Sequence, residues 1–174
     1  MAWPGIAHIV SRHCAGRAIP IIRVAMSPTK TRLAVFDDLL AMLALYRHLN
    51  ADDPVPSDEA ARSAWRELLS QTNSKVLVIE ANGEIAATCT VTIIPSLTRG
   101  ARSYAIIENV VTLPEYRKTG LGSTVVNAAI DAAWAANCYK ISLTTGSRRE
   151  STLRFYEKLG FQKNGRTLFD MRRV

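Results

Sequence analysis

A short loop with two glycines, Arg117-Lys118-Thr119-Gly120-Leu121-Gly122-Ser123, is the part of this chain best suited to chemistry. It follows an Ile- and Val-rich segment at 104–111 and precedes residues 121–136, whose apolar side chains recur at helical spacing. Glycines let the backbone turn tightly, and a helix start carries free N–H groups and a partial positive charge. The loop is therefore predicted to bind an anion, and a phosphate is the expected ligand.

The spacing of the glycines excludes two familiar phosphate loops. A Walker loop needs Gly-Lys-Ser/Thr at its end, whereas Gly122 is followed by Ser123. A dinucleotide fingerprint needs a third glycine where this chain has Val125. The remaining pattern, Arg-x-x-Gly-x-Gly at 117–122, resembles the pyrophosphate-binding motif of the GNAT superfamily of N-acetyltransferases, which hold acetyl-coenzyme A. An ordinary glycine-containing strand-to-helix turn is the alternative.

A second segment, 144–161, resembles the other coenzyme-side motif of the same superfamily and ends in Phe-Tyr-Glu-Lys-Leu-Gly-Phe. Ser147 and Glu150 have the spacing of a capping box, which predicts a helix that Gly160 ends and Phe161 seals. The preceding residues 139–144 alternate as in a strand. Both motifs thus lie at a predicted junction between a strand and a helix.

The resemblance implies an α/β (α+β) fold, with a mixed central sheet flanked by helices, over a single N-acetyltransferase domain at 19–174. Residues 1–18 are expected to form an N-terminal extension. The predicted order is β-α-α-β-β-β-α-β-α-β. Its first half has a strand at 19–26, a helix from Ser27-Pro28 to about Asn50, a helix at 58–71 capped by Ser57, and strands at 75–81 and 84–94 joined by the hairpin signal Asn82-Gly83.

Two residues are candidates for catalytic roles, one from the same resemblance and one from its position in the sequence. Tyr156 stands where the superfamily commonly keeps a tyrosine that protonates the departing thiolate, although packing on the core is an alternative role. Glu108 is the candidate base, because a carboxylate desolvated within the apolar strand 105–111 would be a stronger base. By alternation Glu108 is expected to share a face with Val110. A structural role for Glu108, a position at the edge facing solvent, and a relay of the proton through water all stay open.

The coenzyme-binding residues implied by the resemblance come from the strand, the loop and the start of the last helix. The superfamily often has an asparagine where this chain has Arg149, so either Ser147 supplies that contact or it is lost. The main-chain N–H of Val110 or Val111 would hold the thioester carbonyl. The full set is Val110, Val111, Arg117, Lys118, Thr119, Gly120, Leu121, Gly122, Ser123, Ser147 and Arg149.

Composition agrees with an enzyme of one domain. The chain has 174 residues and a net charge of +7, but no pattern typical of a nucleic-acid-binding module, and no uncharged run that could span a membrane. Part of the positive charge lies in the coenzyme segments. Cys14, Cys89 and Cys138 are dispersed and lack metal spacing, so a cytoplasmic protein with reduced thiols and no metal is expected. Whether it forms a homodimer is left open.

The resulting hypothesis is an acetyl-coenzyme A-dependent N-acetyltransferase that acts on a primary amine of a small molecule or peptide. Direct attack in a ternary complex is expected, because no Ser, Cys or His constellation suggests a covalent intermediate. A non-catalytic acyl-coenzyme A-binding module is the alternative. The acidic residues Asp52, Asp53, Asp58 and Glu59 between the first two helices favour a cationic acceptor, unless they form only a solvated helix start.

Overall fold

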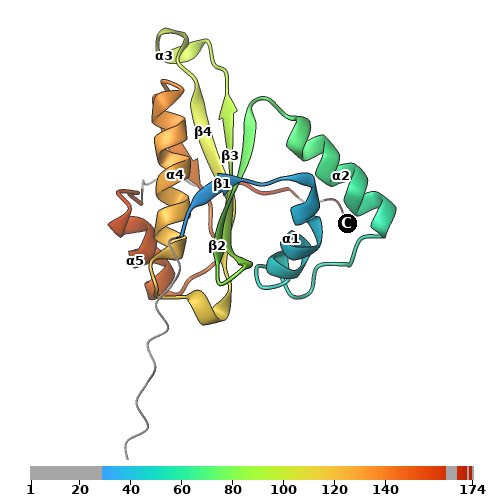
Figure 1. Cartoon of the computed structure of the whole chain (residues 1–174). Helices are drawn as coiled ribbons and strands as arrows, with labels where there is room; N and C mark the ends of the chain where they lie inside the picture. Colours follow the sequence, from blue (N-terminus) through green and yellow to red (C-terminus); the bar gives the residue numbers. More distant parts are fainter. Residues whose placement is uncertain (1–28, 164–167, 172, 174) are drawn as a thin grey trace, which may run out of the picture.

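A five-stranded sheet in the order β1-β2-β3-β4-β5 forms the centre of the computed structural model, which describes residues 29–163, 168–171 and 173 (Figure 1). The first four strands pair antiparallel with their neighbours, and β4 pairs parallel with β5. The strands are β1 (Thr31–Leu33), β2 (Ser74–Ala81), β3 (Glu84–Ile94), β4 (Tyr104–Thr112) and β5 (Ile141–Leu143). The predicted mixed sheet is confirmed.

Helices cover both faces of this sheet (Figure 1). On one face α1 (Leu39–Tyr46) and α2 (Asp58–Ser70) enclose a core with side chains of β2 and β3. On the other face α4 (Leu121–Ala135) packs against β3 and β4, with side chains of α5 (Glu150–Lys158) beside it. Shorter turns are η1 (Phe36–Asp38), α3 (Thr98–Ala101) and η2 (Pro114–Tyr116).

The hairpin between β2 and β3 forms as predicted. Asn82 and Gly83 both have positive φ, 52° and 83°, which is the backbone of the two-residue turn that matches the twist of the strands. Ser57 also caps α2 as predicted, since its hydroxyl accepts the N–H of Ala60 at 3.3 Å.

The long first helix predicted from Ser27 is wrong. Residues Thr31–Leu33 instead pair with β2, and the helical region begins only at Phe36. The cause is a long-range ion pair: Arg32 donates to Asp38 at 2.7 Å and to Glu80 on β2. This arrangement leaves the apolar side chain of Leu33 half exposed. The strand predicted at 19–26 and the extension at 1–18 lie outside the described residues.

The predicted capping box of the last helix is also wrong. The N-cap of α5 is Arg149, and the Ser147 hydroxyl accepts the Arg149 N–H at 3.3 Å in a local turn. The other end follows the prediction, because Gly160 has φ of 92° and the N–H of Phe161 donates to the Tyr156 carbonyl at 3.1 Å. The final strand expected after Phe161 does not form within 161–163, 168–171 and 173.

None of the helices in the described ranges is long and apolar enough to cross a membrane.

Candidate active site

The predicted phosphate loop joins η2 to α4 through two residues with left-handed backbone. Lys118 has φ of 65° and Gly120, the N-cap of α4, has φ of 98°. Between them the hydroxyl of Thr119 donates to the Tyr116 carbonyl at 2.6 Å. The N–H of Thr124 donates to the Gly120 carbonyl at 3.0 Å and begins the helical hydrogen bonds of α4.

Most other N–H groups of this loop have no acceptor among the described residues. In the described part of the chain, the main-chain N–H groups of Lys118 and of 120–123 donate to no backbone or side-chain oxygen. A Cβ at Gly120 would have no heavy atom within 4 Å, so the space beside these groups is open. A diphosphate would supply several anionic oxygens to N–H groups at a helix start. The loop therefore fits the coenzyme that the sequence predicts.

Gly122 has a different role, because it allows close packing. A Cβ there would lie 3.0 Å from Thr112 Oγ1 and 3.6 Å from the Phe155 ring. The start of α4 can thus approach both the end of β4 and α5. The loop is further fixed by buried Tyr116, whose hydroxyl donates to Glu84 at 2.9 Å.

The strand β4 is interrupted beside this loop. Asn109 has φ of 54°, and the register with β3 shifts between Thr88 and Thr90. Pairing of β4 with β5 covers only Ala105 to Ile107, so the β5-facing edge of 108–112 has no strand partner in the described part of the chain. The two strands separate there and leave main-chain groups free near the phosphate loop.

The interruption corrects the alternation expected for Glu108. Ile107 and Val110 both pack in the core beside α4, whereas Val111 belongs to the core beneath α1 and α2. Glu108 therefore faces the α1 side and does not share a face with Val110. Its side chain is exposed, so the predicted desolvation is wrong.

Tyr156 lies half-buried on α5, between the rings of Phe155 and Phe161, whose centroids are 5.0 Å and 6.1 Å from its own. Burial raises the pKa of its phenol, with smaller contributions from Cys89 and Glu108. The charge of Glu108 is the smallest of these three causes. No protein group in the described ranges forms a hydrogen bond with the Tyr156 hydroxyl.

Cys89 lies in the same region but is inert. It is fully buried, and its thiol donates to the Val125 carbonyl at 3.4 Å. Burial raises the pKa of the thiol to about 12, so it stays protonated near neutral pH. Cys89 is therefore a core residue.

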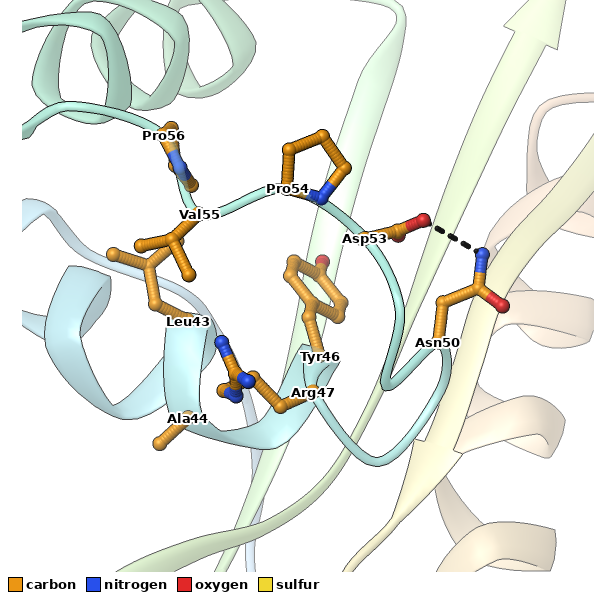
Figure 2. A pocket seen from close by; sticks show the side chains of 9 residues that line it. All are labelled: Leu43, Ala44, Tyr46, Arg47, Asn50, Asp53, Pro54, Val55 and Pro56. Atoms are coloured by element: carbon orange, nitrogen blue, oxygen red, sulfur yellow. Dashed lines mark hydrogen bonds between the residues drawn. The ribbon is translucent and has the colours of Figure 1, made fainter.

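A pocket of about 270 Å³ lies between α1 and the loop that leads to α2 (Figure 2). Of the four acidic residues predicted near the acceptor, only Asp53 lines it, and its carboxylate accepts the Asn50 amide at 2.9 Å. The lining residues are Leu43, Ala44, Tyr46, Arg47, Asn50, Asp53, Pro54, Val55 and Pro56. Tyr46 and Arg47 were not predicted as site residues, because a helical stripe of apolar residues indicates only a core.

Comparisons with known proteins agree with this geometry. A family model described as the acetyltransferase (GNAT) family matches residues 42–161. Glucosamine 6-phosphate N-acetyltransferase of Trypanosoma brucei brucei is 34% identical over 131 residues, which cover 75% of this chain and 87% of that protein.

Two solved structures show the same fold. A putative acetyltransferase from Agrobacterium tumefaciens str. C58 has a TM-score of 0.79 and 43% identity, over 83% of this chain and 99% of that one. Glucosamine-6-phosphate N-acetyltransferase from Arabidopsis thaliana has a TM-score of 0.73 and 27% identity, over 83% and 99%. The fold is that of the N-acetyltransferases that use acetyl-coenzyme A as co-substrate. This chain belongs to the acetyltransferase (GNAT) family.

Proposed function

We propose that this N-acetyltransferase transfers the acetyl group of acetyl-coenzyme A directly to the primary amine of a small molecule, in a ternary complex. The observation that carries the proposal is the row of unpaired N–H groups at Lys118 and 120–123 beside open space at Gly120. They would hold the diphosphate, and the basic side chains of Arg117 and Lys118 would add positive charge.

The thioester would then lie in the opening between β4 and β5. Residues 108–112 have no β5 partner. The main-chain N–H of Val110 or Val111, within this segment, would therefore polarise the thioester carbonyl. Tyr156 would donate its proton to the departing thiolate. Its raised pKa supports this role, because the phenol keeps its proton at neutral pH, and its hydroxyl has no competing protein partner in the described ranges.

The acceptor would approach from the α1 side, where Glu108 faces solvent. Glu108 would take the proton of the attacking amine, directly or through a water molecule. An acetylated enzyme is disfavoured, because the Cys89 thiol is buried and protonated.

The pocket beside α1 supports a small acceptor. Its volume of about 270 Å³ is close to the lower end of ligand pockets, which suits a single sugar ring or a short amine. Two similar proteins are named for glucosamine 6-phosphate, so an amino sugar is the acceptor class we favour. A cationic acceptor remains an alternative because of the acidic loop, although Asp53 is the only one of its four acidic residues that lines the pocket. A lysine-bearing peptide is the competing acceptor.

Initial-velocity measurements test this proposal. Release of free coenzyme thiol is followed while acetyl-coenzyme A and an amine are varied together, for glucosamine, glucosamine 6-phosphate, an aminoglycoside and a lysine peptide. We expect intersecting double-reciprocal lines with an amino sugar as the best acceptor. Parallel lines with an acetylated protein in the mass spectrum would contradict direct transfer. Binding of acetyl-coenzyme A without turnover of any amine would instead support a non-catalytic module.

A further inference from the structure

Two buried side-chain hydroxyls in the described part of the chain make no hydrogen bond: those of Tyr46 and Thr90. A buried hydroxyl without a partner is costly, and such groups are few in folded proteins. Thr88, two residues before Thr90 on the same face of the sheet, has the usual arrangement of a buried hydroxyl. Its hydroxyl donates a hydrogen bond to the Leu77 carbonyl at 2.7 Å. The unpaired hydroxyls therefore need an explanation.

One hydroxyl belongs to a pocket residue, and the other lies on β3 opposite the candidate base. Tyr46 is the last residue of α1 and lines the pocket, and in Figure 2 its hydroxyl points toward the loop at Asp53 and Pro54. Thr90 faces the α1 side, because its neighbours Cys89 and Val91 belong to the core on the other face. In the β3–β4 register, Thr90 is opposite Glu108.

The two hydroxyls lie close together without satisfying each other. Burial raises the pKa of the Tyr46 phenol, and the Thr90 hydroxyl partly offsets this. Their contact is nevertheless longer or less well aligned than a hydrogen bond of normal geometry. Both groups are uncharged at neutral pH, and each can donate and accept.

We propose that the Tyr46 and Thr90 hydroxyls bind a hydroxyl group of the acceptor and thereby select hydroxylated amines over plain ones. This inference rests on the proposed acetyl transfer. An apolar group would leave both hydroxyls unpaired, and an ammonium group, which has donors but no acceptor, could not accept a hydrogen bond from either hydroxyl. An uncharged group that both donates and accepts satisfies the pair, and amino sugars carry several.

The pair is closed to solvent, so the acceptor reaches it by displacing the loop above Tyr46. Residues 51–56 of this loop are exposed. The Asn50–Asp53 hydrogen bond lies within this loop and does not join it to another element. In the described part of the chain, no hydrogen bond or ion pair joins residues 51–56 to another helix or strand.

A first experiment needs no substrate and compares melting temperatures of Tyr46→Phe, Thr90→Val and Thr88→Val. If both hydroxyls are unpaired in the free protein, removing one loses no hydrogen bond. The first two variants should then melt at or above the melting temperature of the parent. Thr88→Val is the matched control, and it should melt several degrees lower because it loses a hydrogen bond to a buried carbonyl. An equal fall in Thr90→Val would show that its hydroxyl is already satisfied, and would overturn the proposal.

A second experiment measures the ratio of kcat/KM for glucosamine to kcat/KM for cyclohexylamine, a ring of the same size without hydroxyls. Tyr46→Phe and Thr90→Val should each lower this ratio about tenfold, whereas Thr88→Val should not. The same ratio in Tyr46→Phe and in the parent would overturn the inference.

Failure of the proposed function is seen separately, because the parent would then acetylate neither amine. In that event calorimetry with glucosamine and the acetyl-coenzyme A-bound parent decides. Weaker binding to Tyr46→Phe supports the pair as a ligand site, and equal binding overturns it.

Discussion

Replacement of Gly120 by valine tests the phosphate loop with a single change. Gly120 has φ of 98°, a conformation that a β-branched residue adopts only with strain. Its new side chain would extend into the open space beside the unpaired N–H groups. The change should therefore weaken the binding of acetyl-coenzyme A by both strain and steric exclusion.

The magnitude can be estimated from the groups involved. A hydrogen bond from an N–H to a charged oxygen contributes about 1.5–3 kcal/mol, so loss of two should weaken binding by roughly 10²- to 10⁴-fold. Backbone strain costs on the order of 1–3 kcal/mol, which lowers the melting temperature of a chain of this size by roughly 2–10 °C.

Gly100→Val provides the matched control. Gly100 also has positive φ, 70°, with no atom within 4 Å of a Cβ, but it lies in α3 at the opposite end of the sheet from the start of α4 (Figure 1). Calorimetry with acetyl-coenzyme A should show weak or no binding to Gly120→Val and parental binding to Gly100→Val. Undiminished binding to a folded Gly120→Val would refute the assignment of the loop.

Three further predictions concern chemistry, acceptor charge and stability. Tyr156→Phe should keep its affinity for acetyl-coenzyme A but lose on the order of tenfold to several hundredfold in kcat; unchanged kcat at saturation would move the acid role elsewhere. Asp52→Asn/Asp53→Asn should raise the KM of a cationic amine, and the difference should shrink with added salt; an indifferent KM would end the cationic hypothesis. Asp38→Asn should destabilise the fold at neutral pH by about 1–2 kcal/mol in denaturant titrations, because Arg32 loses its charged partner. Arg32 lowers the pKa of Asp38, so the stability gained from the pair is present above the pKa of the unfolded carboxyl and is lost as the pH falls below about 4. Parent and variant should then be equally stable. A difference that persists in acid would contradict this reasoning.

The sequence predicted the parts of the site that depend on neighbouring residues. Gly120 and Gly122 lie within a few residues of the helix that they start, and Gly160 and Phe161 end a helix by local hydrogen bonds. Such features need no knowledge of distant strands. The hairpin at 82–83 is local in the same way.

The wrong predictions concern features that depend on contacts between residues far apart in the sequence. The start of α1 depends on Arg32 reaching Glu80, and the opposite faces of Glu108 and Val110 depend on the irregular pairing of β4 with β3. The pocket at Tyr46 forms only when the loop to α2 returns over α1. These contacts join residues that are far apart in the sequence, and a pattern within a short window does not reveal them. The sequence alone therefore could not predict them.

The central claim is that the N–H groups of the α4 start bind the diphosphate of the coenzyme. Amide NMR spectra recorded during a titration with coenzyme A test it most directly, with pantetheine, which lacks the diphosphate, as the control ligand. The amides of Lys118 and 120–123 should shift with coenzyme A and stay in place with pantetheine, while Gly100 is unaffected by either. Saturable binding of coenzyme A that leaves these loop amides unshifted would contradict the claim.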